Sequence, residues 1–213
     1  LDAGVFTLGS VTLSGSGGPD HLIAGGGNFD DNLVGGSGDD TFTGANVATA
    51  WSIISDNSGS AIGTGRGDDS FSGVEFLTGG SGTDDFVLIG GTLAGAINGG
   101  TGSNTLQLDD TANTVTVTGT NSGTATGTGG FSNINGAITG GSSTDDFVFA
   151  AGATLSSIDG ATGNDTLTLD ADNNTVVHNI TGSNQGDITV LGLSTISYTG
   201  VESRTLNNVP AGG

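Results

Sequence analysis

The chain has 213 residues, of which 43 are Gly and only 33% are apolar, fewer apolar residues than a compact multilayer core needs. Two basic residues stand against 22 acidic residues, and this formal charge of −20 excludes nucleic acid as a partner and disfavours an anionic membrane. The chain has no Cys, no Met, no signal peptide and no apolar run near 18 residues, so we expect a mature product or a fragment without disulfides or membrane insertion.

The first 34 residues are predicted to form an N-terminal cap and the first coils of the fold. Residues 1–13 alternate well enough for a strand pair, VFTL and SVTL. Three Gly/Asp turns follow, centred on Asp20, Asp31 and Asp40, at spacings of 11 and 9 residues. If each spacing is half a coil, Asp20 and Asp40 lie on one edge and Asp31 lies on the opposite edge.

Segments rich in β-branched residues follow Gly44, Asn113 and Asn174. Each leads through a turn, SDNSG, TNSG or GSNQG, into a strand that contains Phe or Tyr. The stretches FSGVEF and YTGVES match closely, and this match places Glu75 and Glu202 at one equivalent position.

The stretch Gly79–Asp109 is repeated without a gap as Gly140–Asp170, at an offset of 61 residues. Within each copy a Gly-rich turn recurs after 20 residues. A period of this length is typical of solenoids, in which each repeat must stack on the next to bury its apolar face. We therefore expect about three coils of about 20 residues per unit and roughly ten coils in the chain, with a repeat region at 35–206 and a tail at 207–213.

A coil of about 20 residues fits three short strands joined by turns. This predicts an all-β fold, a right-handed parallel β-helix forming one elongated domain. The apolar residues of DDFVLI, NTLQL, DDFVF and DTLTL would fill the interior, and Thr and Ser would alternate outward. A stacked antiparallel sandwich is the alternative.

The turns GGSGDDTFT, at 35–43, and GGSGTDDFV, at 79–87, fit the pattern G-G-x-G-x-D-x-U-x at every specified place. They resemble the repeats-in-toxin, or haemolysin-type, calcium-binding nonapeptides. In that family an ion sits between turns stacked on one edge, so the resemblance implies three pairs, which are Asp20 with Asp40, Asp84 with Asn104, and Asp145 with Asp165. The chain departs from the family because tandem nonapeptides are absent beyond Asp40, and Asn104 lacks one charge. We expect one to three calcium sites.

Calcium takes six to eight oxygens, and a Gly-rich turn with an Asp offers backbone carbonyls and a hard carboxylate. The predicted ligand and turn residues are Asp20, Asp31, Asp40, Asp69, Asp84, Asn104, Asp145 and Asp165, with Gly36, Gly38, Gly80, Gly82, Gly100 and Gly102. The alternative is that the motif is only good turn chemistry, with Asp making Asx turns. The surplus of carboxylates favours calcium, because stacked Asp residues without a cation repel each other.

The longer unit resembles the Gly- and Asp-rich β-strand repeats of large secreted bacterial adhesins and surface fibres. This resemblance implies a structural, extracellular or cell-surface protein, such as a filament subunit, an adhesin stalk or a matrix protein. Self-association into fibres and contact with surface glycans or other cells are the partners that it implies.

Other functions have less support in the residues. Parallel β-helices also include polysaccharide lyases and hydrolases, but a lyase needs a basic residue and the chain offers only Arg66 and Arg204. We therefore expect no enzyme. Rows of Thr leave ice binding open, a secretion-type calcium domain is a further alternative, and the tripeptide Arg66-Gly67-Asp68 lies within a variant of the same turn.

Overall fold

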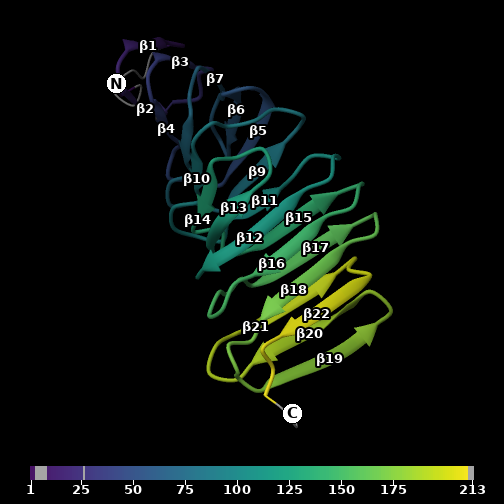
Figure 1. Cartoon of the computed structure of the whole chain (residues 1–213). Helices are drawn as coiled ribbons and strands as arrows, with labels where there is room; N and C mark the ends of the chain where they lie inside the picture. Colours follow the sequence, from purple (N-terminus) through teal and green to yellow (C-terminus); the bar gives the residue numbers. More distant parts are fainter. Residues whose placement is uncertain (3–8, 26, 211–213) are drawn as a thin grey trace. The chain divides into compact units, whose positions relative to one another are not determined.

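The structure is a computed structural model that describes residues 1–2, 9–25 and 27–210 (Figure 1). Within these residues there is no helix, and the ordered elements are short β-strands joined by turns. It follows that no helix in this part of the chain is long and apolar enough to cross a membrane. The predicted all-β class is confirmed, whereas the predicted strand VFTL, residues 5–8, lies outside the described residues.

The chain divides into two compact units, the first of which comprises residues 1–105 and 127–132. One of its sheets has the strand order β1-β3-β7-β6-β5-β9, and the other has the order β2-β4-β8-β10-β14. The strands of this unit are β1 (Thr12–Gly17), β2 (His21–Ile23), β3 (Asn32–Ser37), β4 (Thr41–Thr43), β5 (Thr49–Ser55), β6 (Ser58–Gly63), β7 (Asp68–Ser72), β8 (Phe76–Thr78), β9 (Asp84–Leu88), β10 (Ala96–Asn98) and β14 (Gly130–Ser132).

The second unit comprises residues 106–126 and 133–213. Its sheets have the strand orders β11-β15-β17-β21-β20-β19 and β13-β12-β16-β18-β22. Its strands are β11 (Thr105–Gln107), whose first residue belongs to the first unit, β12 (Thr114–Gly119), β13 (Ser122–Ala125), β15 (Ala137–Gly141), β16 (Asp146–Phe149), β17 (Ser157–Ala161), β18 (Thr166–Asp170), β19 (Val176–Gly182), β20 (Gln185–Val190), β21 (Thr195–Thr199) and β22 (Ser203–Asn207). The proposed division into a cap, a repeat region and a tail stays a prediction.

Each 20-residue repeat contains two strands, one in each sheet. In the first unit β1 and β3 pair in parallel in one sheet, and β2 and β4 pair in parallel in the other. The prediction of three strands per coil is therefore wrong. The reason lies in the turns, because a Gly/Asp turn comes after every 9 to 11 residues and leaves room for only two strands of three to six residues in each repeat.

The segments after Gly44, Asn113 and Asn174 form antiparallel hairpins, β5–β6, β12–β13 and β19–β20. The expected turns lie at the hairpin tips, and the strands with aromatic residues are β7, β14 and β21, as predicted. The sheets are therefore mixed, with parallel pairing between repeats and antiparallel pairing at these hairpins. The predicted parallel stack of roughly ten coils does not include these antiparallel hairpins.

Equivalent apolar residues of successive strands stack in columns and form the core. In the first unit one column follows the parallel register through Leu22, Phe42, Leu77, Ile97 and Phe131, all of them buried. In the second unit β12, β16 and β18 lie side by side (Figure 1), and a second column follows the register of these strands. The residues of this second column are Val117, Phe149 and Leu169. Of the predicted interior residues of DDFVLI, NTLQL, DDFVF and DTLTL, the Leu and Phe side chains are buried as predicted, whereas Val87 and Val148 are only partly buried and Ile89 is exposed.

Candidate functional site

The candidate site comprises the turn edges at which the Asp residues of the Gly-rich turns stack in pairs, at the starts of β2 and β4, of β9 and β11, and of β16 and β18. In each pair the backbone N–H of the first residue donates to Oδ1 of the equivalent side chain in the following repeat. The three predicted pairs are brought together in this way: Asp20 to Asp40 at 2.7 Å, Asp84 to Asn104 at 3.0 Å, and Asp145 to Asp165 at 2.7 Å. The side chain therefore satisfies a backbone donor that precedes the strand.

The carbonyl groups of the same residues complete the link between repeats. The Asp20 carbonyl accepts from the N–H of Thr41, and the Asp145 carbonyl accepts from the N–H of Thr166, both at 2.9 Å. The pairs Asp20–Asp40 and Asp145–Asp165 are thus each joined by a backbone–carboxylate bond and a neighbouring backbone–backbone bond. Because charge-assisted hydrogen bonds are among the stronger ones, this edge couples one repeat to the next.

Asp31 and Asp69 lie at the starts of β3 and β7, in the sheet that also contains Asp84 on β9 and not in the sheet of β2 and β4. The N–H of Val11 donates to Asp31 Oδ1 at 3.0 Å, and the N–H of Asp31 donates to Asp69 Oδ1 at 3.1 Å. Asp31 therefore lies apart from Asp20 and Asp40, which precede strands of the opposite sheet, as the half-coil spacing predicts.

Glu75 belongs to the edge of Asp40 in the first unit, and Glu202 belongs to the edge of Asp165 in the second, although the motif does not include them. Glu75 Oε2 accepts from the N–H of Asp40 at 2.9 Å, and its Oε1 accepts from the Asn57 side chain at 2.9 Å. Glu202 makes the equivalent bonds, with the N–H of Asp165 at 2.7 Å and with the Asn184 side chain. Their predicted equivalence is confirmed, and the match between FSGVE and YTGVE was the available signal.

The first glycine of each turn lies five residues before the Asp and directly beneath its carboxylate. A β-carbon at Gly15, Gly35, Gly79, Gly140 or Gly160 would stand 2.2–2.6 Å from the Oδ2 atom of the Asp in its own turn. No residue with a side chain fits there without displacing the carboxylate. These glycines are not among the predicted site residues, and their fixed spacing from the Asp is the signal that could have identified them.

The other predicted glycines of the motif, with one exception, have the positive backbone φ angles that glycine permits in tight turns. The backbone φ angle is positive at Gly36, Gly38, Gly80, Gly100 and Gly102. Gly82 differs, because the absence of a side chain serves a close approach there. A β-carbon at Gly82 would lie 2.2 Å from the backbone of Val47.

The second oxygen of several of these carboxylates is buried without a hydrogen-bond partner. These atoms are Oδ2 of Asp20, Asp40, Asp84 and Asp165. Backbone carbonyl oxygens of the following repeat approach the same places, at 1.9–2.6 Å from the β-carbon positions of the first glycines, and belong to Gly35, Gly73, Gly99 and Gly200. A buried charge beside carbonyl dipoles is unfavourable. In agreement with this, burial raises the pKa of Asp84 to about 6 and also raises the pKa of Asp165.

A carboxylate oxygen and a carbonyl oxygen are the donors that calcium prefers, but two oxygens fall short of the six to eight that it takes. Among the described residues, no three side chains of His, Cys, Asp or Glu come together to hold a metal ion. Oδ1 of Asp40 and Oδ1 of Asp165 already accept from a backbone N–H, and Oδ1 of Asp84 accepts from the indole N–H of Trp51. The arrangement therefore does not fit a calcium ion as it stands, and calcium binding at the predicted residues stays a prediction.

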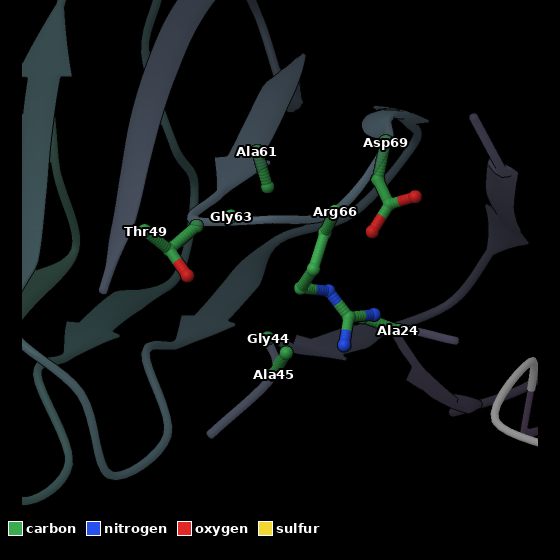
Figure 2. A pocket seen from close by; sticks show the side chains of 8 residues that line it. All are labelled: Ala24, Gly44, Ala45, Thr49, Ala61, Gly63, Arg66 and Asp69. Carbon is green, nitrogen blue, oxygen red and sulfur yellow. The ribbon is translucent and has the colours of Figure 1, made fainter. Parts of the chain in front are cut away.

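Arg66 lies beside Asp69 in a narrow hollow of the first unit (Figure 2). Figure 2 shows its side chain extending toward Ala24 and Ala45, and the hollow leaves no room for a water molecule. Burial raises the pKa of Asp69 to about 6, against the opposing effects of the Asp31 N–H and the Arg66 charge. Arg66 is thus occupied within the fold, while Asp68 is exposed.

Two other hollows in the described residues are larger than the one beside Arg66 and are open. One of about 270 Å³ is lined by residues such as Thr120, Asn121, Asn135 and Thr195, and has no carboxylate or His in its lining. A second, of about 200 Å³, has Asp85 as its one carboxylate. Neither offers the pair of carboxylates that glycoside hydrolysis uses.

A scan against models of known protein families found no match to this chain, and a search among curated proteins also found none. The resemblance to the repeats-in-toxin nonapeptides therefore depends on the motif residues alone.

Proposed function

We propose that the chain is a structural, non-catalytic segment of an extracellular or cell-surface bacterial protein, which acts as a stalk, fibre or matrix module. Its repeats would form a right-handed β-solenoid with two strands per repeat. The observation that carries this proposal is the edge of stacked Asp residues, because the most distinctive side chains of the sequence bond to the next repeat of the same chain.

This use of side chains suits a load-bearing element. In a stack of similar repeats each repeat contacts only its neighbours, and stability is close to a sum of repeat and interface contributions. Bonds such as that from Asp145 to Asp165 strengthen those interfaces. Columns of buried apolar residues do the same in the core. A negative charge spread over many exposed acids would keep such a module soluble and limit nonspecific association.

The ice-binding alternative receives less support from the register of the strands. An ice-binding face would need a regular Thr array, but Asp146 lies between Thr114 and Thr166, and Val148 lies between Thr116 and Thr168. The outward rows are thus interrupted.

Small-angle X-ray scattering on the purified chain tests the proposal. A stalk module should give a particle much longer than it is wide, and it should keep its β-type circular dichroism at high dilution. The measurement should be made with calcium and with a chelator, so that the predicted role of calcium is tested at the same time. A compact, near-spherical particle would contradict the proposed function in either condition.

A further inference from the structure

The three hairpins occupy equivalent places in the fold. Near the turn of each hairpin, a Gly on the second strand pairs with an aliphatic residue on the first strand. The pairs are Ile53 with Gly59, Val117 with Gly123, and Ile180 with Gly186. By the same register, Trp51, Val115 and His178 are equivalent, since they lie opposite Ala61, Ala125 and Ile188.

Two further contacts support the equivalence of β5 and β19. The rings of Trp51 and Phe71 lie 6.3 Å apart, and the rings of His178 and Tyr198 lie 5.7 Å apart at a similar tilt. At the hairpin tips, Asn57 bonds to Glu75 just as Asn184 bonds to Glu202. The hairpin β19–β20 is thus a third copy of β5–β6.

Two of the hairpins are covered by a parallel strand from the following repeat. Strand β9 pairs with β5 and places Phe86 against Trp51 and Leu88 against Ile53. Strand β16 pairs with β12 and places Phe147 against Val115 and Phe149 against Val117. The side chains on β5 and β12 at these positions are fully buried.

The covering strands have one sequence pattern, Asp-Asp-Phe-Val followed by Leu or Phe, at 84–88 and 145–149. The loop that follows each strand also reaches the hairpin tip. The N–H of Asn57 donates to the Thr92 carbonyl, and the N–H of Asn121 donates to the Thr154 carbonyl, both at 2.8 Å.

The third hairpin has no such cover in the described part of the chain, where β19 pairs with β20 alone. Ile180, at the position of the fully buried Ile53, is 61% exposed, and Val177, on the opposite face of the same strand, is 53% exposed. An uncovered strand of seven residues with exposed apolar side chains is a ready template for strand addition.

We infer that β19 is a docking edge for a parallel strand of the pattern Asp-Asp-Phe-Val-Leu, presented by a further repeat unit of this type. The Phe of that strand packs against His178 and the Leu packs against Ile180, in the register that β9 adopts on β5. The Thr of its following loop accepts from the N–H of Asn184. The occupant is identified by the two internal copies, in which the same surface is already covered by this pattern.

This inference deepens the proposed function, because it names the contact through which one repeat unit joins the next. The two can fail separately. A chain that is elongated in scattering yet binds no such strand would remain a stalk without this joint, and a compact chain that binds the strand would keep the joint without the stalk.

The test uses the whole chain and a fluorescein-labelled peptide of residues 79–92, GGSGTDDFVLIGGT, in a fluorescence anisotropy titration. The controls are the peptide with Phe86→Asp, the chain with Ile180→Asp, and the chain with Ile62→Asp. Ile62 is a matched control because it is also an exposed Ile, 46% exposed, but lies on β6. Since Ile180 is exposed, its variant should melt at the temperature of the parent when no peptide is present.

We expect saturable binding to the parent chain and to Ile62→Asp. Binding should be weaker by about tenfold or more for Ile180→Asp and for the Phe86→Asp peptide, because each change removes one buried apolar contact. Equal binding by parent and Ile180→Asp, or no saturable binding to the parent, would overturn the inference. A chain that forms oligomers and excludes the peptide would also overturn it, since a second copy's own edge would then occupy β19.

Discussion

The carboxylate of Asp84 is folded back over the backbone of Gly79, five residues earlier, with its Oδ2 atom 2.5 Å from the place where a β-carbon would stand. The carbonyl oxygen of Gly99 lies 2.6 Å from the same place. The G-G-x-G-x-D turn thus has a steric reason for its first glycine that is separate from any need for a positive φ angle.

Gly79→Ala should therefore destabilise the first unit by about 1–3 kcal/mol, because the new methyl group displaces the carboxylate or the neighbouring carbonyl. Gly9→Ala is the control, since a β-carbon at Gly9 meets no atom of the described residues within 4 Å. Urea unfolding can be followed by the fluorescence of Trp51, the single Trp of the chain, which lies in the same unit. Equal midpoints for the two variants would show that the carboxylate does not need this space.

Stability should fall as the pH rises from about 4 to about 7. Burial raises the pKa values of Asp84 and Asp69 to about 6, above the ordinary value of 3.8, so the folded state binds more protons than the unfolded state in this range. The resulting stabilisation is fully present below the unfolded pKa and is lost as the pH rises through the folded pKa. Melting temperatures measured between pH 4 and pH 8 check this, and a maximum near neutrality would contradict it.

Asp84→Asn should stabilise the first unit at about pH 7.5 by about 1–2 kcal/mol and reduce the pH dependence. The amide is uncharged at every pH, and Asn104 shows that this edge accepts an amide in the next repeat. Asp39→Asn is the matched control, because Asp39 is exposed and its loss changes the net charge equally. If Asp39→Asn stabilises as much, general charge repulsion and not burial is the cause.

Glu75 accepts from the backbone of Asp40 and from the side chain of Asn57 with one carboxylate, so its removal should lower the stability of the first unit. Glu75→Ala leaves the Asp40 N–H and the Asn57 amide without their acceptors, and we expect a loss of about 1–3 kcal/mol. Glu75→Gln keeps one acceptor oxygen and should lie between Ala and the parent. Asp56→Ala, at the exposed hairpin tip, is the comparison for a carboxylate outside this edge. An Ala variant as stable as the parent would show that water replaces both bonds.

The pairing of Asp20 with Asp40 and of Asp145 with Asp165 could be predicted because a 20-residue period in a stack brings equivalent positions together whatever the details of the coil. The apolar columns could also be predicted, since alternation along a strand fixes which side chains point inward and the period stacks them. What the period does not reveal is the bonding partner. A carboxylate that accepts a backbone N–H of the preceding repeat and one that binds a cation require the same spacing.

The hairpins and the two-strand repeat were harder to predict. A β-branched run such as VATAWSII has the same local pattern in a parallel coil and in an antiparallel hairpin, and the choice depends on tertiary pairing. Glu75 lies outside the motif and joins the edge only because its longer side chain reaches from the next strand. Such a contact depends on the fold, and no regular spacing in the sequence indicates it.

Ile53 and Ile180 provide a matched pair for the state of the two hairpin edges. They are the same residue type at the same hairpin position, but Ile53 is fully buried beneath β9 and Ile180 is 61% exposed on β19. Ile53→Ala should cost about 2–5 kcal/mol through lost burial and the cavity that remains, whereas Ile180→Ala should cost less than about 0.5 kcal/mol. Trp51 fluorescence follows the first variant, and the fluorescence of Tyr198, the single Tyr, follows the second. A large cost at Ile180 would mean that β19 is covered in solution, as β5 is covered by β9.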